Sequence, residues 1–123
     1  MHKLIRGMIC LKLVFLYQPV SNVKEALTYY RDVLGFEEAW REGEETIGMH
    51  LPNSDVRLMI EDENEGLPGG GIFLVDSVDE FYEEKKEKVH FIREPFDIPP
   101  GRYAIFTDNS GNPIRIIDFS KEQ

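Results

Sequence analysis

Two stretches of the chain decide its fold because they repeat one pattern: FLYQPVSNVKE at residues 15–25 and GGIFLVDSVDE at residues 70–80. Each starts as an apolar strand and continues into the beginning of a helix. Each also carries a capping box, Asn22 with Glu25 and Ser77 with Glu80. In a capping box the first side chain accepts from a free backbone N–H and the glutamate reaches back. We therefore expect one module written twice, with a cavity where its two halves meet.

The residues after each stretch predict the rest of the module. The first half carries apolar residues at helical spacing, and Gly35 stands where a left-handed cap ends a helix. Those apolar residues are Val23, Ala26, Leu27, Tyr30 and Leu34. The pattern then predicts strands over 37–41, 46–51 and 56–61. In the second half it predicts a strand over 72–75, a helix from Val78, and strands near 89–93, 103–107 and 114–119.

These elements predict a single α+β domain over residues 1–123. It would hold one βαβββ module at about 10–61 and a second at about 70–120. The acidic and then glycine-rich stretch at about 62–69 is the expected linker. Residues 97–101, DIPPG, predict a rigid turn at the rim of the cavity.

Composition excludes several classes of partner. The chain has 23 acidic and 14 basic residues and a formal net charge of −9, which disfavours nucleic acid and anionic lipid. Lys12 interrupts the apolar run near the start, and no cleavage site follows it, so neither a signal peptide nor a membrane span is expected. A lone cysteine, Cys10, cannot close a disulfide within the chain. These features predict a cytoplasmic protein.

Two further motifs carry a family resemblance. LTYYRDVLGF at residues 27–36 resembles the helix-to-strand signature of the glyoxalase, bleomycin-resistance and extradiol-dioxygenase group, the vicinal oxygen chelate superfamily. PGRYAIFTDNSGNPI at residues 100–114 resembles its closing strand, Asp-x-x-Gly-Asn hairpin and last strand. The resemblance covers roughly residues 10 to 120. It implies a mixed sheet that curls around a shared cavity, and a homodimer.

Enzymes of that superfamily hold a divalent metal with His, Gln or Glu side chains of the first and last strands of each module. Carried over, these positions fall on Phe15, Met59, Gly70 and Arg115. None offers a carboxylate, imidazole or thiolate, and a guanidinium repels a cation. Shifting the register by two residues adds only Glu61, and one carboxylate does not make a metal site. The resemblance therefore predicts no metal, no cofactor, and no metal-dependent glyoxalase or dioxygenase activity.

Without a metal, the cavity is predicted to be a small-molecule pocket with apolar walls and few polar anchors. The candidate ligand-binding residues are Phe15, Tyr17, Trp40, Arg57, Met59, Glu61 and Arg115. Arg115 needs a partner, either Glu61 or a ligand carboxylate, because an unpaired buried charge is costly. The alternative is that both arginines turn to solvent and the apolar side chains form ordinary core.

Three functions fit these predictions. The first is a metal-free protein that sequesters a drug or metabolite, similar in role to the bleomycin-resistance branch. The second is a lyase-, isomerase- or dioxygenase-like enzyme that uses Glu61 or His50 as a base and Arg115 as an electrophilic anchor. The third is an interaction or regulatory domain whose cavity has closed. The acidic surface suits a cationic ligand and Arg115 an anionic one, so the sequence leaves the ligand charge open.

Overall fold

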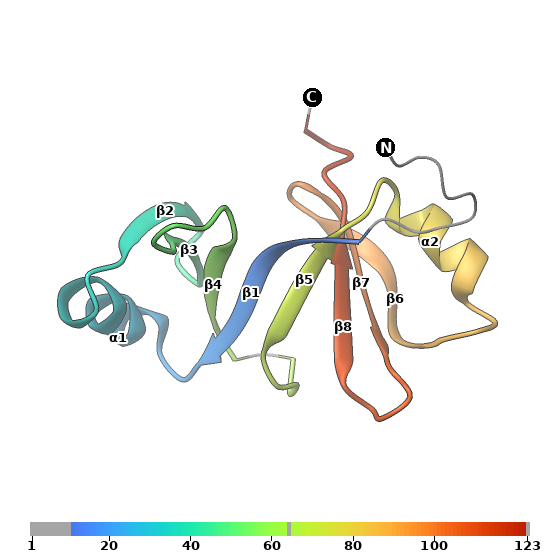
Figure 1. The fold of residues 1–123 in the computed structure, drawn as a ribbon, viewed down its shortest axis with the longest axis horizontal. Helices are drawn as coiled ribbons and strands as arrows, with labels where there is room; N and C mark the ends of the chain where they lie inside the picture. Colours follow the sequence, from blue (N-terminus) through green and yellow to red (C-terminus); the bar gives the residue numbers. More distant parts are fainter. Residues whose placement is uncertain (1–10, 64, 123) are drawn as a thin grey trace.

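The protein is described by a computed structural model that covers residues 11–63 and 65–122. Eight strands form one open mixed sheet in the order β2-β3-β4-β1-β5-β8-β7-β6, with a helix at each end of the molecule (Figure 1). The elements of the first half are β1 (Lys12–Val20), α1 (Val23–Thr28), the π-helix η1 (Tyr29–Val33), β2 (Glu37–Glu42), β3 (Thr46–His50) and β4 (Arg57–Asp62). Those of the second half are β5 (Gly70–Leu74), α2 (Val78–Lys85), β6 (His90–Ile98), β7 (Gly101–Thr107) and β8 (Pro113–Ile117).

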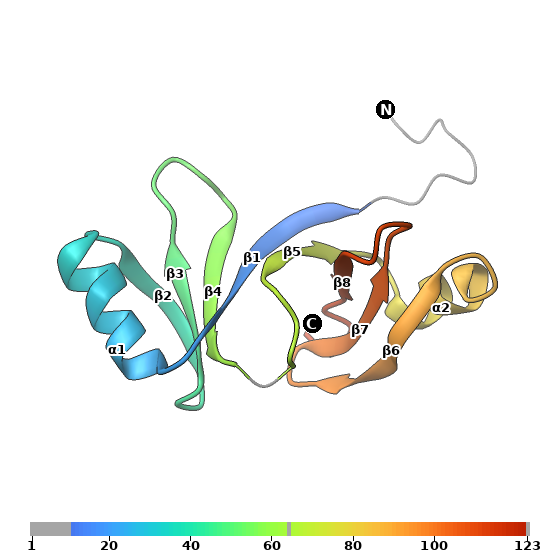
Figure 2. The ribbon, with the colours of Figure 1, turned by 90° about the horizontal axis from the view of Figure 1, so that it is seen from below.

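The pairing of the strands confirms the predicted α+β fold of two βαβββ modules. β1 runs parallel to β4, β5 runs parallel to β8, and β1 and β5 meet antiparallel in the middle of the sheet. Tyr17 pairs with Met59 in the first half, as Ile72 pairs with Arg115 in the second. Figure 2 shows the sheet curling, with β2–β4 on one side, β6–β8 on the other, and β1 and β5 joining them.

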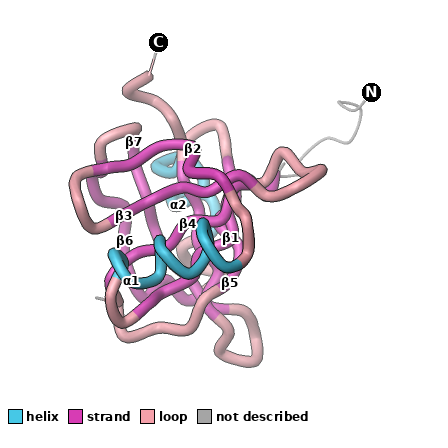
Figure 3. The backbone as a smooth tube through the Cα atoms, turned by 90° about the vertical axis from the view of Figure 1, so that its left-hand side faces the viewer, coloured by secondary structure: helices cyan, strands magenta, loops and turns pink. Residues whose placement is uncertain are grey.

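Alternating side chains divide the sheet between two kinds of core. On β4, β7 and β8 the even-numbered residues face the helices: Leu58 and Ile60 pack with α1, and Ala104 and Ile116 pack with α2. The residues of opposite parity on these strands, together with Tyr17 of β1 and Ile72 of β5, join a third cluster on the concave face, to which both modules contribute. This division follows because successive strand residues point to opposite faces. Viewed along the long axis, α1 lies in front of the strands and α2 behind them (Figure 3).

The helix starts agree with the predicted caps only in part. Asn22 Oδ1 accepts from the backbone N–H of Glu25 at 2.9 Å, and Ser77 Oγ accepts from that of Glu80 at 3.1 Å. The predicted return bonds from the two glutamates are not found within the described residues. Each glutamate instead leaves its side chain exposed to solvent.

The first helix departs from the predicted regular pattern at its second half. Residues 29–33 adopt a π-helix, whose wider turn shifts the later side chains around the axis. Leu34, predicted on the buried face, is therefore 46% exposed. Gly35 has φ of +80°, the left-handed conformation expected of the residue that ends this helix.

The strand boundaries differ by a few residues from those predicted, most of all in β6, which continues through Glu94 and Pro95 to Ile98. The lone cysteine, Cys10, lies outside the described residues. In the described part of the chain, no helix has the length and apolar character needed to span a membrane.

Candidate ligand-binding cavity

A cavity of about 820 Å³ lies between the concave sides of the two modules. The first half contributes Phe15, Tyr17, Trp40, Arg41, Glu42, Thr46, Met59 and Glu61 to its lining. The connecting segment contributes Glu65, and the second half contributes Arg93, Phe96, Ile98, Pro99, Pro100, Tyr103, Ile117, Phe119 and Glu122. The volume lies within the ~300–1,000 Å³ range of small-molecule pockets.

Aromatic side chains build the wall of the first module. Phe15 of β1 meets Trp40 of β2 edge to face, with ring centroids 5.7 Å apart. The indole of Trp40 lies directly over Gly48, its neighbour on β3, where a Cβ atom would overlap the ring. Gly48 is therefore the residue that lets Trp40 lie flat against the sheet, and a glycine inside a strand is the sequence signal of such a close approach.

Glu61 is the polar centre of this wall. Its Oε1 accepts from the Tyr17 hydroxyl at 2.9 Å, and its Oε2 accepts from the Thr46 hydroxyl at 2.6 Å. Both donors are neutral. Burial, and then the charge of Glu61 and its hydrogen bond, raise the pKa of Tyr17 far above its ordinary value, so this hydroxyl stays protonated.

Arg115 faces the same concave side but is covered from the cavity. Its side chain is fully buried, and its Nη2 donates to Glu65 Oε1 at 3.1 Å and to the Pro68 carbonyl at 2.7 Å. The guanidinium carbon lies 4.4 Å from the centroid of the Tyr17 ring, a cation–π contact. Its Nη1 is buried without a hydrogen-bond partner among the described residues. Of the two partners considered for Arg115, Glu61 or a ligand carboxylate, Glu61 is not the one found: the connecting segment crosses Arg115 and places Glu65 against it.

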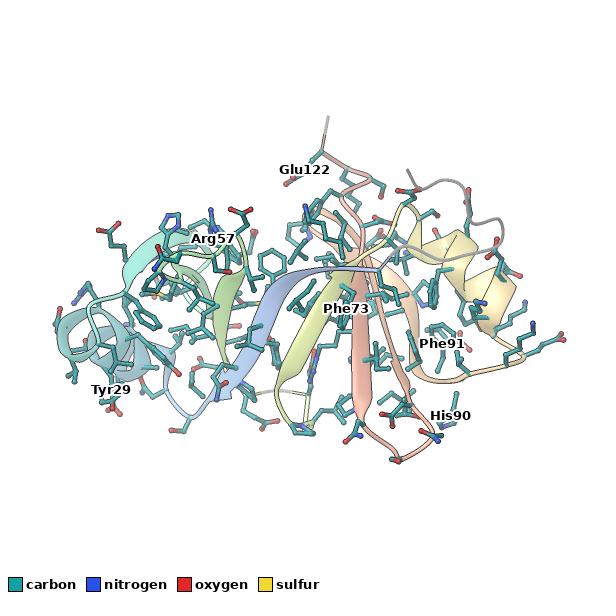
Figure 4. All side chains as sticks on the ribbon, in the orientation of Figure 1. Tyr29, Arg57, Phe73, His90, Phe91 and Glu122 are labelled. Carbon is teal, nitrogen blue, oxygen red and sulfur yellow. The ribbon has the colours of Figure 1, made fainter. Side chains whose placement is uncertain are left out.

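The other predicted polar residues lie outside the cavity lining. Arg57 begins β4, where its guanidinium donates to the carbonyl of Asp55 at 3.0 Å instead of turning inward (Figure 4). His50 is exposed at the end of β3, opposite Arg57, and does not line the cavity either. The predicted cavity position of Arg57 is therefore wrong, and the role of His50 as a base stays a prediction that its place outside the lining does not support.

Phe15, Tyr17, Trp40, Met59 and Glu61 do line the cavity, and their contact with a ligand stays a prediction. Sequence reasoning missed most of the opposite wall. Tyr103 and Ile117 share the odd-numbered face of their strands, so strand parity could have found them. The residues Ile98, Pro99 and Pro100 belong to the turn predicted at the rim.

The position of Glu65 beside Arg115 had only a weak signal in the sequence, namely the glycines that follow Glu65. A Cβ atom on Gly69 would lie 2.5 Å from the Tyr17 carbonyl oxygen, so the connecting segment must pass tightly over β1. This close passage brings Glu65 and Pro68 to Arg115.

The metal positions implied by the resemblance do not fit a divalent ion. Phe15 and Met59 present apolar atoms to the cavity, Gly70 has no side chain, and Arg115 is a buried cation held by Glu65. Within residues 11–63 and 65–122, no three His, Cys, Asp or Glu side chains gather as a metal would require. The carboxylates of Glu61 and Glu65 together supply too few ligands for such a metal site.

A family model for the Glyoxalase/Bleomycin resistance protein/Dioxygenase superfamily matches residues 12–116. The chain belongs to this superfamily. Solved structures agree with the superfamily fold. A glyoxalase/bleomycin resistance protein/dioxygenase superfamily member from Vibrio splendidus 12B01 is 21% identical, with a TM-score of 0.58 over 89% of this chain and 99% of that one.

Two other solved structures with a similar fold are described as enzymes. An NAD-dependent benzaldehyde dehydrogenase from Legionella pneumophila is 18% identical, with a TM-score of 0.71 over 85% of this chain and 97% of that one. A methylmalonyl-CoA epimerase from Mycobacterium tuberculosis is 16% identical, with a TM-score of 0.61 over 95% of this chain and 93% of that one. At such identities these similarities establish the fold alone. No curated protein matches the sequence significantly.

Proposed function

We propose that this superfamily member is a metal-free protein that binds a small organic molecule in the cavity between its two modules. The observation that carries the proposal is the cavity itself: about 820 Å³ in volume, lined mainly by aromatic and aliphatic side chains. Apolar walls with a few polar anchors are the usual composition of a small-molecule site. A cavity of this size also argues against a domain whose interior has closed.

The proposal includes binding without a metal because of the chemistry of the implied metal positions. Arg115 places a fixed positive charge where the superfamily enzymes use a metal ligand, and Glu65 neutralises it. Replacing donors by aromatic, thioether and guanidinium groups removes affinity for divalent ions. Sequestration of a drug or metabolite is the role that needs only such a cavity.

An acid–base enzyme is the second candidate, and one observation favours it. Glu61 is a half-buried carboxylate that lines the cavity and lacks a cationic partner among the described residues. Both of its oxygens already accept a hydrogen bond, from the Tyr17 and Thr46 hydroxyls, and this engagement favours a binding role over proton abstraction.

Native mass spectrometry of the purified protein, together with elemental analysis after dialysis, tests the first proposal. We expect a small organic adduct, or thermal stabilisation by members of a metabolite and drug library, and no stoichiometric divalent metal. Near one zinc, nickel, iron or manganese per chain would contradict it. Conversion of a stabilising compound, followed by liquid chromatography, would favour the enzyme instead, and Glu61→Gln should then abolish turnover.

A further inference from the structure

We infer that the cavity selects an apolar organic cation, such as an aromatic amine, with Glu61 as its counter-ion. This inference rests on the proposed binding function and names the chemical class of the ligand. It resolves the opposing indications of the sequence, in which an acidic surface and Arg115 favoured ligands of opposite charge.

Arg115, the positive charge that favoured an anionic ligand, already pairs with a carboxylate of the protein. Arg115 is fully buried, does not line the cavity, and is paired with Glu65 at 3.1 Å. A ligand carboxylate would have to displace both Glu65 and the covering connecting segment to reach it. An intramolecular carboxylate already in place makes that exchange unfavourable.

Glu61 is the opposite case, a half-buried carboxylate in the cavity with neutral partners only. The Tyr17 and Thr46 hydroxyls hold its two oxygens in fixed positions, and within the described residues no Lys, Arg or His nitrogen lies within salt-bridge distance of it. A partly desolvated charge without a counter-ion gains strongly from one. The fixed hydroxyls leave the remaining lone pairs of Glu61 available to a ligand ammonium group.

The rim of the cavity adds to the same preference. Its exposed acids are Glu42 and Glu122, while Arg41 is held by Glu38 through two hydrogen bonds of 2.7 Å. Arg93 lies over the Phe96 ring at 4.4 Å, and no carboxylate among the described residues lies within salt-bridge distance of it. Within the described part of the chain, the lining therefore holds one cation without a carboxylate partner, Arg93, and three carboxylates without a cationic partner, Glu42, Glu61 and Glu122. The net charge of the cavity is negative.

The aromatic walls suit the apolar part of such a ligand and its charge. Phe15 and Trp40 meet edge to face beside Glu61, and Tyr103 and Phe96 face them from the second module. Aromatic faces attract a cation that is within about 6 Å of the ring centroid. A flat aromatic group with an ammonium substituent would therefore find both a stacking surface and a counter-ion.

Three probes with one shape and different charge test the inference: 1-naphthylmethylamine, 1-naphthalenemethanol and 1-naphthoate. Titration calorimetry gives each Kd, and the fluorescence of Trp40, the single tryptophan, reports occupancy of the cavity. We expect the amine to bind about tenfold more tightly than the alcohol, as for a hydrogen bond to a charged group, and the carboxylate to bind most weakly.

Two variants assign the preference to Glu61. Glu61→Gln should bring the amine down to the affinity of the alcohol, while retained binding of the alcohol shows that the cavity is intact. Glu84→Gln makes the same charge change on the exposed side of α2 and should leave all three affinities unchanged. The preference of the wild-type protein among the probes is informative even where Glu61→Gln folds poorly.

The outcomes separate this inference from the proposed function. Equal binding of amine and alcohol, tighter binding of the carboxylate, or a preference that survives Glu61→Gln would overturn the cation assignment and leave small-molecule binding standing. If none of the probes binds, the charge of any adduct seen by native mass spectrometry decides: a cation supports the inference and an anion or neutral compound overturns it. Absence of any ligand in both experiments removes the proposed function and the inference together.

Discussion

At the residue scale, the pair of Arg115 and Glu65 is unequal in its surroundings. The Arg115 side chain is 0% exposed, whereas that of Glu65 is 12% exposed and borders the cavity. Removing one member of a buried pair is costly because it leaves the other charge unpaired. The cost depends on whether that remaining charge can reach water, which Glu65 can do and Arg115 cannot.

This asymmetry predicts the order of two mutants. Glu65→Gln should lower the free energy of unfolding by about 3 kcal/mol, because it leaves Arg115 buried without a counter-ion. Arg115→Met should cost about 1 kcal/mol or less, because Glu65 regains water and an unpartnered Nη1 is removed. Urea unfolding of both variants and of the double mutant measures this, and the double mutant should recover most of the Glu65→Gln loss. A larger loss for Arg115→Met than for Glu65→Gln would contradict the prediction.

At the scale of elements, each helix is fixed to its own module by an aspartate at the end of the module's last strand. Asp62 accepts from the first N–H of α1, at Val23, and Asp118 accepts from the first N–H of α2, at Val78, both at 2.8 Å. Asp118 also accepts from the backbone N–H of Arg102 and from the backbone and hydroxyl of Ser120. Both modules therefore share a hydrogen bond from the helix start to an aspartate after the last strand. In the second module this aspartate accepts additional hydrogen bonds.

The two aspartates give a matched pair of mutants. Burial alone would raise the pKa of Asp118, but its hydrogen bonds from Val78, Ser120 and Arg102 outweigh burial and lower the pKa. A lowered folded pKa means that this stability is present above the unfolded value of about 3.9 and is lost as pH falls through the folded pKa. Asp118→Asn should cost about 2–4 kcal/mol at pH 7, since an amide nitrogen cannot accept, and Asp62→Asn about 1 kcal/mol.

Chemical unfolding at pH 7 and at a series of acidic pH values tests both statements. The stability difference between the wild-type protein and Asp118→Asn should shrink as the pH falls, because protonation weakens the wild-type carboxylate. A difference that stays constant down to the acid transition would show that the charge of Asp118 does not stabilise α2.

At the scale of the whole molecule, the open sheet leaves two edges and part of its central strand uncovered. β2 and β6 are the edge strands, and edges present unpaired backbone groups to other chains. Leu13 and Leu16 of β1 are each 40% exposed, and the aromatic ring of Tyr29 points away from α1 into solvent (Figure 4). Such surfaces favour association with a second copy.

We therefore predict a homodimer at micromolar concentration. Size-exclusion chromatography with light scattering should give twice the mass of the chain. Dilution should lower this mass only at much smaller concentrations. A monomer mass throughout the micromolar range would reject the prediction and leave the exposed leucines without a partner.

The sequence by itself determined the two modules, the strand faces and the aromatic wall of the first module, because repeats, caps and alternation are local patterns. The family resemblance pointed to Phe15 and Met59, and the period of two residues then added Tyr17 and Glu61 on the same faces. Only the tertiary structure decided that Glu65 reaches Arg115 and that Arg57 stays outside the cavity. The path of a connecting segment and the curl of a sheet depend on contacts between residues far apart in the chain, and no local period encodes them.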